Sequence, residues 1–357
     1  MTDRKLKPTR RAVLAGGTAA ALALPAVWTG ARAQTKRLIV RTPGGPTAEA
    51  MKKAYYEPFQ AATGIEIVAA TSNNEPVSQI KAIVESKAKT WDMAASLSRS
   101  AVNQLVKDGD FLEKHGLENE AVVKEIPESF RNAHAIGHGV YATPLTYRKD
   151  KFKEPPQNWQ DFFDVKKFPG PRAMRKNPQE TMEIALMADG VDRKSLYPLD
   201  IDRAFKSLDR IKPHVAHWWT SPVQAIQLIT NGDVEMVPVW GNFPIAAIEQ
   251  QNAPLGISWQ NNIWGCDMFT ILKGGDNADA CRKFILFCLQ GEQQAGVGNR
   301  VAIAPTNPNA FKFISPERAK VLATNAEYLA SGVGLDDAFW AANRDAIADR
   351  FNKWLLS

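Results

Sequence analysis

Asp267 is the only charged residue in the 23 positions between Glu249 and Lys273, and it stands in the stretch NNIWGCDMFTIL. Trp264 and Phe269 lie close by, and the stretch otherwise predicts a buried strand. A carboxylate that is buried without a partner is costly, so it needs a cation, hydrogen-bond donors or water. Either the fold or a ligand must supply that partner.

Two histidine pairs have spacings that could serve a metal site. His134 and His138 are four positions apart, which on a helix places two imidazoles on one face. Their segment AHAIGHGVYA is rich in glycine and predicts a strand or a loop, where that relation fails. His214 and His217 come without an acidic third ligand at helical spacing. Motifs for haem, dinucleotide or serine-hydrolase chemistry are also missing, so we expect no cofactor and rank a metal-dependent exported enzyme third.

The cysteines and one tyrosine pair predict core packing rather than chemistry. Cys281 and Cys288 are seven positions apart in a predicted helix, a separation of about 10 Å, which is too long for a disulfide. Cys266 lies in the predicted strand beside Asp267. Small buried thiols behave as hydrophobic residues, and the pair Tyr55–Tyr56 falls in a predicted amphipathic helix.

The first 33 residues predict an export signal. Residues 1–11 carry five basic groups and one acid, residues 12–30 are uncharged and rich in alanine, and ARAQ offers a cleavage site after Ala33. The run TRRAVL (9–14) resembles a twin-arginine signal. These residues carry a net charge of +5 (six basic, one acidic), so the whole-chain charge of +6 leaves about +1 for the remainder. That small charge predicts no nucleic-acid partner.

Beyond the signal, short strands alternate with helices. Strands are expected at 36–42, 65–71 and 91–97, each followed by an amphipathic helix, which predicts a parallel sheet flanked by helices. Ligands of such sheets bind beyond the carboxyl ends of the strands. Small polar residues stand at these ends, although turns and helix caps would select the same residue types. They are Thr42, Gly44, Ser72, Asn73, Ser96 and Ser98.

A second region opens after about residue 142. Helices are expected at 180–190 and around 200–211, followed by a helix that ends at Gly232 and a strand at 234–240 that ends in Trp240. A strand beginning at Met268 and a helix at 278–289 resume the alternation of strands and helices seen in the first region. A helical tail is expected over about 315–357. No apolar run in this body is long enough to span a membrane.

Six segments in this order resemble the periplasmic solute-binding proteins of ABC importers, in particular the spermidine/putrescine-binding proteins. They are WDMAAS, NWQDFFDVKKFPG, SPVQAIQLITNGDVEM, PVWGN, DMFTILKGG and APTNPNA. The resemblance covers about residues 36–312. It implies an α/β type II periplasmic binding protein fold in which two lobes, each a mostly parallel sheet flanked by helices, close on a ligand in the cleft between them.

The resemblance also implies a domain organisation and a partner. We expect a first lobe of residues 36–141 plus 266–312, and a second lobe of residues 142–265 plus 313–357. The closed form of such a protein docks on the permease subunits of the importer in the inner membrane. We therefore expect a periplasmic, monomeric protein that binds a small-molecule solute and is not an enzyme.

By the same resemblance, Asp267 accepts a hydrogen bond from a ligand ammonium group, and Trp240 stacks on the ligand. In the polyamine binders a Trp precedes the amine-binding Asp by two positions, where this chain has Gly265; Trp264 is displaced by one. Of the pair Trp218–Trp219, alternation lets only one side chain face a cleft, and we include Trp219. For each tryptophan the alternative is packing in the core. For Asp267 the alternative is capping a neighbouring helix or pairing with an arginine.

The basic stretch PRAMRKNPQE departs most from the polyamine binders, which carry acidic residues there. Arg172, Arg175 and Lys176 make a long polycation a less favourable ligand, although a solvated basic stretch is the ordinary explanation. Our first hypothesis is an amine-bearing, polyamine-like solute held by Asp267. The alternative is an anionic or zwitterionic solute, such as a carboxylate, an amino acid or a phosphonate, held by Arg175 or Lys176 and by helix N-termini.

Overall fold

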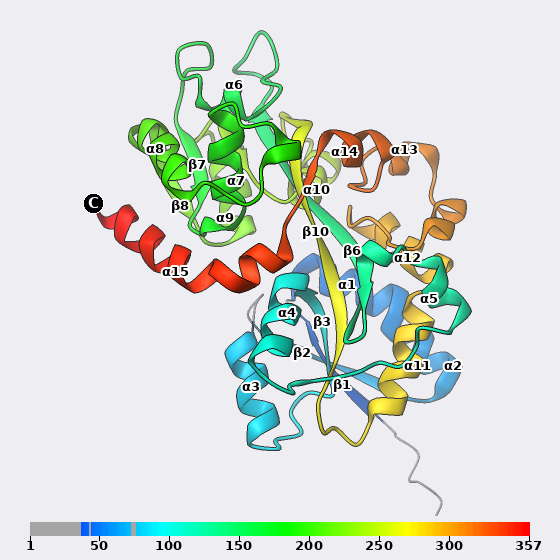
Figure 1. Ribbon diagram of the computed structural model, residues 1–357. Coiled ribbons are helices and arrows are strands. Elements are labelled where there is room, and N and C mark those ends of the chain that lie inside the picture. Colours follow the sequence, from blue (N-terminus) through cyan, green and yellow to red (C-terminus); the bar gives the residue numbers. More distant parts are fainter. Residues whose placement is uncertain (1–36, 43, 73–75) are drawn as a thin grey trace, which may run out of the picture. The chain divides into compact units, whose positions relative to one another are not determined.

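The computed structural model describes residues 37–42, 44–72 and 76–357 (Figure 1). The predicted signal at 1–33 and the candidate residue Asn73 lie outside the described residues. In the described part, no helix combines the length and the apolar character needed to cross a membrane.

Three parallel strands form the first part of the sheet in the order β2-β1-β3, as the alternating pattern predicted. Their bounds are β1 Arg37–Thr42, β2 Glu66–Thr71 and β3 Met93–Ser98. The helices that follow them are α1 Gly45–Met51, which continues through a π-helix (Lys52–Tyr56) into α2 Glu57–Thr63, then α3 Val77–Glu85 and α4 Arg99–Asp108. Gly64 ends α2 with a φ of 73°, a left-handed conformation that glycine adopts readily.

Two long antiparallel strands, β6 Ala135–Arg148 and β10 Leu255–Leu272, connect this part of the sheet to the rest. Strand β10 pairs with β3 on one side and with β6 on the other. It begins 13 positions before Met268, where the sequence predicted a return to alternating strands and helices, and it contains the whole stretch NNIWGCDMFTIL. Short elements accompany these strands: β4 Leu112–Glu113, α5 Ala121–Glu125, a 3-10 turn Glu128–Phe130 and β5 Arg131–Asn132.

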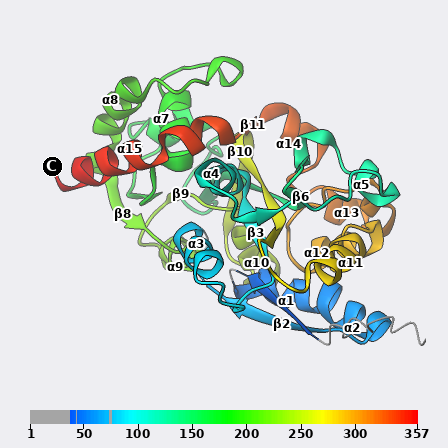
Figure 2. The same ribbon diagram turned by 60° about the horizontal axis from the view of Figure 1, so that its bottom comes forward.

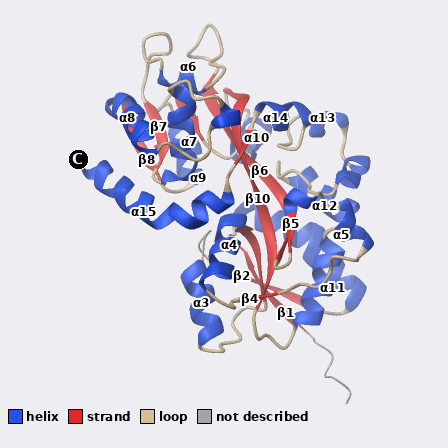
Figure 3. Cartoon of the chain, in the orientation of Figure 1, coloured by secondary structure: helices blue, strands red, loops and turns tan. Residues whose placement is uncertain are grey.

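The second part of the sheet continues from β6 in the order β9-β7-β8, and β7 is parallel to both of its neighbours. The strands are β7 Arg172–Arg175, β8 Val215–Trp219 and β9 Met236–Pro238. Their helices are α6 Trp159–Phe163, α7 Pro178–Ala188, α8 Ile201–Ile211, α9 Pro222–Asn231 and α10 Asn242–Gln251, with 3-10 turns at Arg193–Ser195 and Lys212–His214. Figure 3 shows helices beside both groups of strands.

The remaining elements are helical apart from one short strand, in line with the predicted helix at 278–289 and the predicted helical tail from about residue 315. The elements are α11 Ala278–Cys288, α12 Gly291–Arg300, a 3-10 segment Pro308–Phe313, α13 Pro316–Ala319, α14 Ala326–Ser331, β11 Val333–Gly334 and α15 Asp337–Leu356. All three cysteines are free and buried, as predicted. Two of them lie in α11.

The apolar residues form one large cluster around β1, β3 and α11 and two smaller clusters around β7 to β9. The predicted lobe boundaries fall inside β6 and β10, and both strands contribute to the large cluster and to the smaller ones. Those boundaries remain a prediction. In the order of the sheet, β3 lies beside β10 and β9 lies beside β6. Strand ends predicted to carry ligand contacts therefore stand on both sides of the two long strands.

Candidate functional site

The carboxyl ends of β7, β8 and β9 bring three of the predicted residues together. Arg175 and Trp219 stand at the ends of β7 and β8 and are register partners. Trp240 follows β9 by two residues, so the strand is shorter than the expected 234–240. The guanidinium carbon of Arg175 lies 4.9 Å from the centre of the Trp240 ring and 5.9 Å from that of Trp219. The two indoles meet edge to face at 6.5 Å. We call Arg175, Trp219 and Trp240 the tryptophan cluster.

Glu180, which the sequence did not single out, holds the tryptophan cluster in place. Its carboxylate lies 3.3 Å from Nη1 of Arg175 and accepts a hydrogen bond of 3.2 Å from the indole Nε1 of Trp240. Glu180 is buried near the start of α7 with a φ of 73°. Non-glycine residues seldom adopt this conformation, and such strain concentrates at functional sites. In the sequence Glu180 looked like an ordinary first-turn residue of the helix.

Ser98 and Asp267 face each other across β3 and β10. The hydroxyl of Ser98 accepts a hydrogen bond of 3.1 Å from the amide of Ala101, so it caps α4, and it lies 2.9 Å from the hydroxyl of Ser100. Asp267 is half-buried. The capping alternative therefore applies to Ser98, while Asp267 remains partly accessible to solvent and to a solute.

The ends of β1 and β2 also lie side by side. The carbonyl of Thr42 accepts a hydrogen bond of 3.2 Å from the amide of Ser72. Gly44 has a φ of 82°, and a Cβ at this position would lie 2.8 Å from Cγ2 of Thr71. Because both facts favour glycine, close packing of the turn accounts for Gly44 without a ligand.

Arg41 is a second residue that the sequence did not single out. The side chain is fully buried, and its Nε donates to the hydroxyl of Ser72 at 2.9 Å. Its Nη1 donates to the carbonyls of Ala95 at 3.0 Å and Ser96 at 3.3 Å. Arg41 thus ties the ends of β1, β2 and β3 to one another. Nothing in the pattern of RLIVRT marks this arginine as buried.

His138 supports the backbone of Ser96. Its Nε2 accepts a hydrogen bond of 3.2 Å from the amide of Ser96, which has a φ of 57°, and its ring stacks on Phe269 at 4.0 Å. Burial lowers the pKa of His138 to about 3, so the ring is neutral. His138 lies in β6 and His134 lies in the turn before it, so the two are not on a helix, as predicted. Among the described residues no three metal-ligating side chains form a group.

Trp264 does not join the tryptophan cluster. It is three positions from Asp267 on a regular strand, so the two side chains leave opposite faces of β10. Its ring meets Phe130 edge to face at 6.3 Å and lies against Gly334. Its indole N–H is buried without a hydrogen-bond partner in the described part of the chain. These contacts favour the core alternative for Trp264.

Tyr141 occupies the place that Gly265 leaves open. The two residues are register partners on β6 and β10, and a Cβ at Gly265 would lie 2.5 Å from the Tyr141 hydroxyl oxygen. Tyr141 and Asp267 are diagonal neighbours on one face of the β6–β10 pair. The Tyr141 ring also meets Trp240 at 6.0 Å. An aromatic side chain is therefore present beside Asp267, but it comes from the neighbouring strand.

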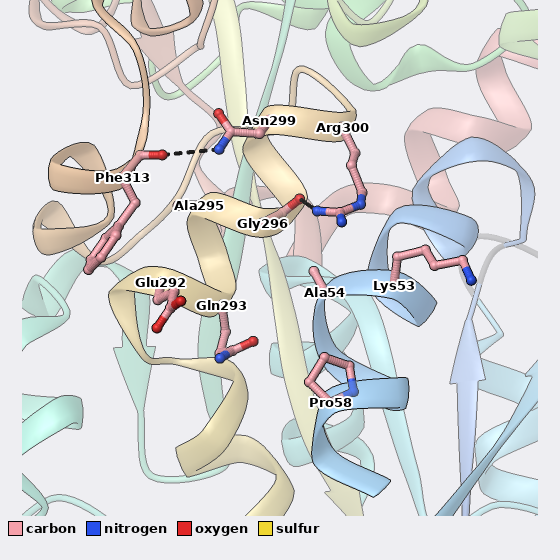
Figure 4. A pocket seen from close by; sticks show the side chains of 10 residues that line it. All are labelled: Lys53, Ala54, Pro58, Glu292, Gln293, Ala295, Gly296, Asn299, Arg300 and Phe313. Carbon is pink, nitrogen blue, oxygen red and sulfur yellow. Dashed lines mark hydrogen bonds between the residues drawn. The ribbon is translucent and has the colours of Figure 1, made fainter. Parts of the chain in front are cut away.

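A surface cavity of about 450 Å³ lies elsewhere, between the π-helix with α2 and helix α12 (Figure 4). Two of its polar side chains are bonded to the backbone: Arg300 donates to the carbonyl of Gly296 at 2.7 Å, and Asn299 donates to that of Phe313 at 3.1 Å. None of its lining residues belongs to the strand ends described above. It adds nothing to the candidate site.

The model of the bacterial extracellular solute-binding protein family matches residues 54–326, which is well over half of the chain. The chain belongs to this family. A gamma-aminobutyric acid-binding protein of Pseudomonas aeruginosa is 29% identical over 329 residues, covering 91% of this chain and 92% of that protein. A spermidine/putrescine-binding periplasmic protein of Salmonella typhimurium is 22% identical over 79% of this chain and 82% of its own length.

Solved structures agree with this assignment. An ABC transporter substrate-binding protein from Bradyrhizobium japonicum is 31% identical with a TM-score of 0.85, covering 90% of this chain and all of that one. A structure described as a GABA receptor is 32% identical with a TM-score of 0.81, covering 89% and 97%. The type II periplasmic binding protein fold is thereby confirmed. The protein is an extracytoplasmic substrate-binding component of an ABC transporter and not an enzyme.

Proposed function

We propose that the protein captures a small solute that carries an ammonium group at one end and a carboxylate at the other, and delivers it to an ABC importer permease. An omega-amino acid such as 4-aminobutyrate has this chemistry. The ammonium group binds Asp267, and the carboxylate binds at the tryptophan cluster. This refines the amine-bearing hypothesis and favours its zwitterionic alternative over a polyamine.

The position of Arg175 above the Trp240 ring carries this proposal. The guanidinium lies on the aromatic face where a second ammonium group of a polyamine would otherwise stack. Glu180 could neutralise such an ammonium group, but its carboxylate is already bound by Arg175 and by the indole of Trp240. A carboxylate, in contrast, gains a charge-assisted hydrogen bond from the guanidinium.

The relatives give independent support. Two of the similar proteins are named for gamma-aminobutyric acid and others for spermidine and putrescine, so an amine is common to all of these named ligands. Asp267 is a carboxylate that can serve any of them. The sequence departs from the polyamine binders at Gly265, and the aromatic contact there comes from Tyr141.

Calorimetric titration of the protein purified from the periplasm tests the proposal. We expect 4-aminobutyrate to bind at least about tenfold more tightly than butylamine or butyrate, since each lacks one charged contact. Tighter binding of putrescine or spermidine would instead establish the polyamine hypothesis. Binding of butyrate and other anions alone would remove the ammonium contact from Asp267.

We further propose that residues 1–33 direct export by the twin-arginine route. The pair Arg10–Arg11 precedes a modestly apolar segment, as such signals do. Replacement of both arginines by lysine should leave the protein unprocessed in the cytoplasm, as should expression in cells without a twin-arginine translocase. Normal processing in either case would assign export to the general secretory route.

A further inference from the structure

The C-terminal helix α15 contacts two parts of the molecule in different ways. On one side its apolar residues Trp340, Ile347 and Phe351 are buried in the cluster that also contains Phe205 and Leu208 of α8. The indole of Trp340 donates to the buried carboxylate of Glu183 on α7 at 2.7 Å. This burial attaches α15 firmly to the second part of the sheet.

The other side of α15 contacts α4 through polar groups. Arg99 lies 3.9 Å from Asp337, and Nη2 of Arg344 donates to the hydroxyl of Ser100 at 2.5 Å. Figures 1 and 2 both show α15 beside α4 and α7. Helix α4 packs into the large cluster through Val102 and Leu105, and within the described residues no α15 side chain belongs to that cluster. Polar contacts of this kind can separate and reform without exposing a core.

Arg344 joins the two halves of the candidate site. The Nη2 that donates to Ser100 also donates to Oε1 of Gln179 at 3.0 Å. Ser100 in turn lies 2.9 Å from the hydroxyl of Ser98, the register partner of Asp267, and Gln179 precedes Glu180 in the chain. One guanidinium therefore connects the Asp267 side to the tryptophan cluster. In the described part of the chain the Nε of Arg344 is buried without a hydrogen-bond partner.

We propose that α15 is a latch for the closed form and that Arg344 is its positioning residue. When the two parts of the sheet separate, α15 stays with α7 and α8, and the contacts of Arg344 and Asp337 with α4 break. In the solute-free protein these contacts raise the population of the closed form. A solute therefore has to supply less binding free energy to close the protein. The latch acts on every solute alike, because Arg344 acts through Ser100 and Gln179.

Small-angle X-ray scattering of the solute-free protein tests the latch independently of the ligand. Arg344→Met keeps the aliphatic stem and removes the donors, and Ser100→Ala removes the acceptor on α4. We expect each variant to raise the ratio of open to closed molecules about tenfold, seen as a larger radius of gyration at an unchanged melting temperature. The double variant should be no more open than either single one, and Arg344→Lys should restore part of the closed population.

Arg350→Met is the matched control. Arg350 lies on the same helix, but it pairs with Asp202 of α8, which stays with α15. Its scattering should equal that of the wild type. Unchanged scattering of Arg344→Met and Ser100→Ala would overturn the latch, whether or not the solute proposed above is correct. Equal expansion of the Arg350 variant would also overturn it, because the effect would then belong to the helix as a whole.

Discussion

The guanidinium carbon of Arg175 lies 4.9 Å from the centre of the Trp240 ring, while the indole N–H of the same ring donates to Glu180. The three side chains come from β7, the residues after β9 and the start of α7, so they fix the ring from both its face and its edge. A ring held in this way loses little side-chain entropy when a solute packs against it, which favours affinity.

Replacing Trp240 should weaken solute binding more than it weakens the fold. We expect Trp240→Ala to reduce the affinity for 4-aminobutyrate by roughly tenfold or more, because it removes an aromatic contact and releases Arg175 and Glu180. Trp240→Phe should lose less of this affinity, since phenylalanine keeps an aromatic ring and lacks only the indole N–H. Trp218→Phe is the control, because Trp218 packs on Phe351 and Trp354 of α15 and should leave titration calorimetry unchanged.

Asp267→Asn should abolish most of the affinity for ammonium-bearing solutes. Loss of a charge-assisted hydrogen bond costs about 1.5 to 3 kcal/mol, which is roughly 10- to 150-fold in affinity. The half-buried position of Asp267 should make the isosteric amide well tolerated, with little change in urea denaturation. Asp276→Asn, at an exposed ion pair with Lys89, provides the control. If Asp267→Asn binds 4-aminobutyrate like the wild type, the carboxylate is structural.

Glu183 should make the stability of the fold depend on pH. Burial raises the pKa of Glu183 from 4.5 to about 7, and hydrogen bonds from Tyr197 and Trp340 oppose this only in part. Between these two pH values the folded protein holds a proton that the unfolded chain has lost. The contribution of Glu183 to stability must therefore fall as pH rises from 4.5 to 7, by up to about 1.4 kcal/mol per pH unit.

The variant Glu183→Gln isolates this effect, since glutamine resembles the neutral acid and does not titrate. Its stability relative to the wild type should increase by about 3 kcal/mol in urea denaturation between pH 4.5 and pH 7.5. The difference between the two proteins is the useful measurement, because the lowered pKa of His138 gives a slope of opposite sign in both. A difference that stays constant with pH would show that Glu183 is ionised in the folded protein.

Sequence alone placed Trp240 at the end of a strand, because apolar runs and turn residues mark where such strands end. It selected Arg175 from a basic stretch and Trp219 from a tryptophan pair, without predicting the strands β7 and β8 that bring them beside Trp240. It could not find Glu180, whose role depends on a left-handed backbone conformation, or Arg41, whose burial inside RLIVRT follows from contacts with β2 and β3. Both depend on partners distant in the chain.

The aromatic residue beside Asp267 shows the same limit. A Trp one position closer in the chain would share the face of Asp267, so Trp264 seemed a slightly shifted substitute. A shift by one residue, however, turns the side chain to the other face of the strand. The partner in space is Tyr141, which only the register of β6 against β10 reveals.

Gly265→Ala should destabilise the fold through Tyr141. The new Cβ would lie 2.5 Å from the Tyr141 hydroxyl oxygen and 2.6 Å from its Cζ, so the ring or the strand must move. Overpacking of this kind typically costs about 1 to 3 kcal/mol. In a Tyr141→Ala background the same substitution should cost little, which gives a coupling energy of at least about 1 kcal/mol in a double-mutant cycle.

Gly275→Ala is the matched control for this cycle, because its Cβ would meet only the carbonyl oxygen of Leu272 at 3.8 Å, an ordinary contact. It should change the free energy of unfolding in urea by less than about 0.5 kcal/mol. Additive effects of Gly265→Ala and Tyr141→Ala would mean that the glycine is required for another reason. In that event Tyr141 would not explain why position 265 carries a glycine and not a tryptophan.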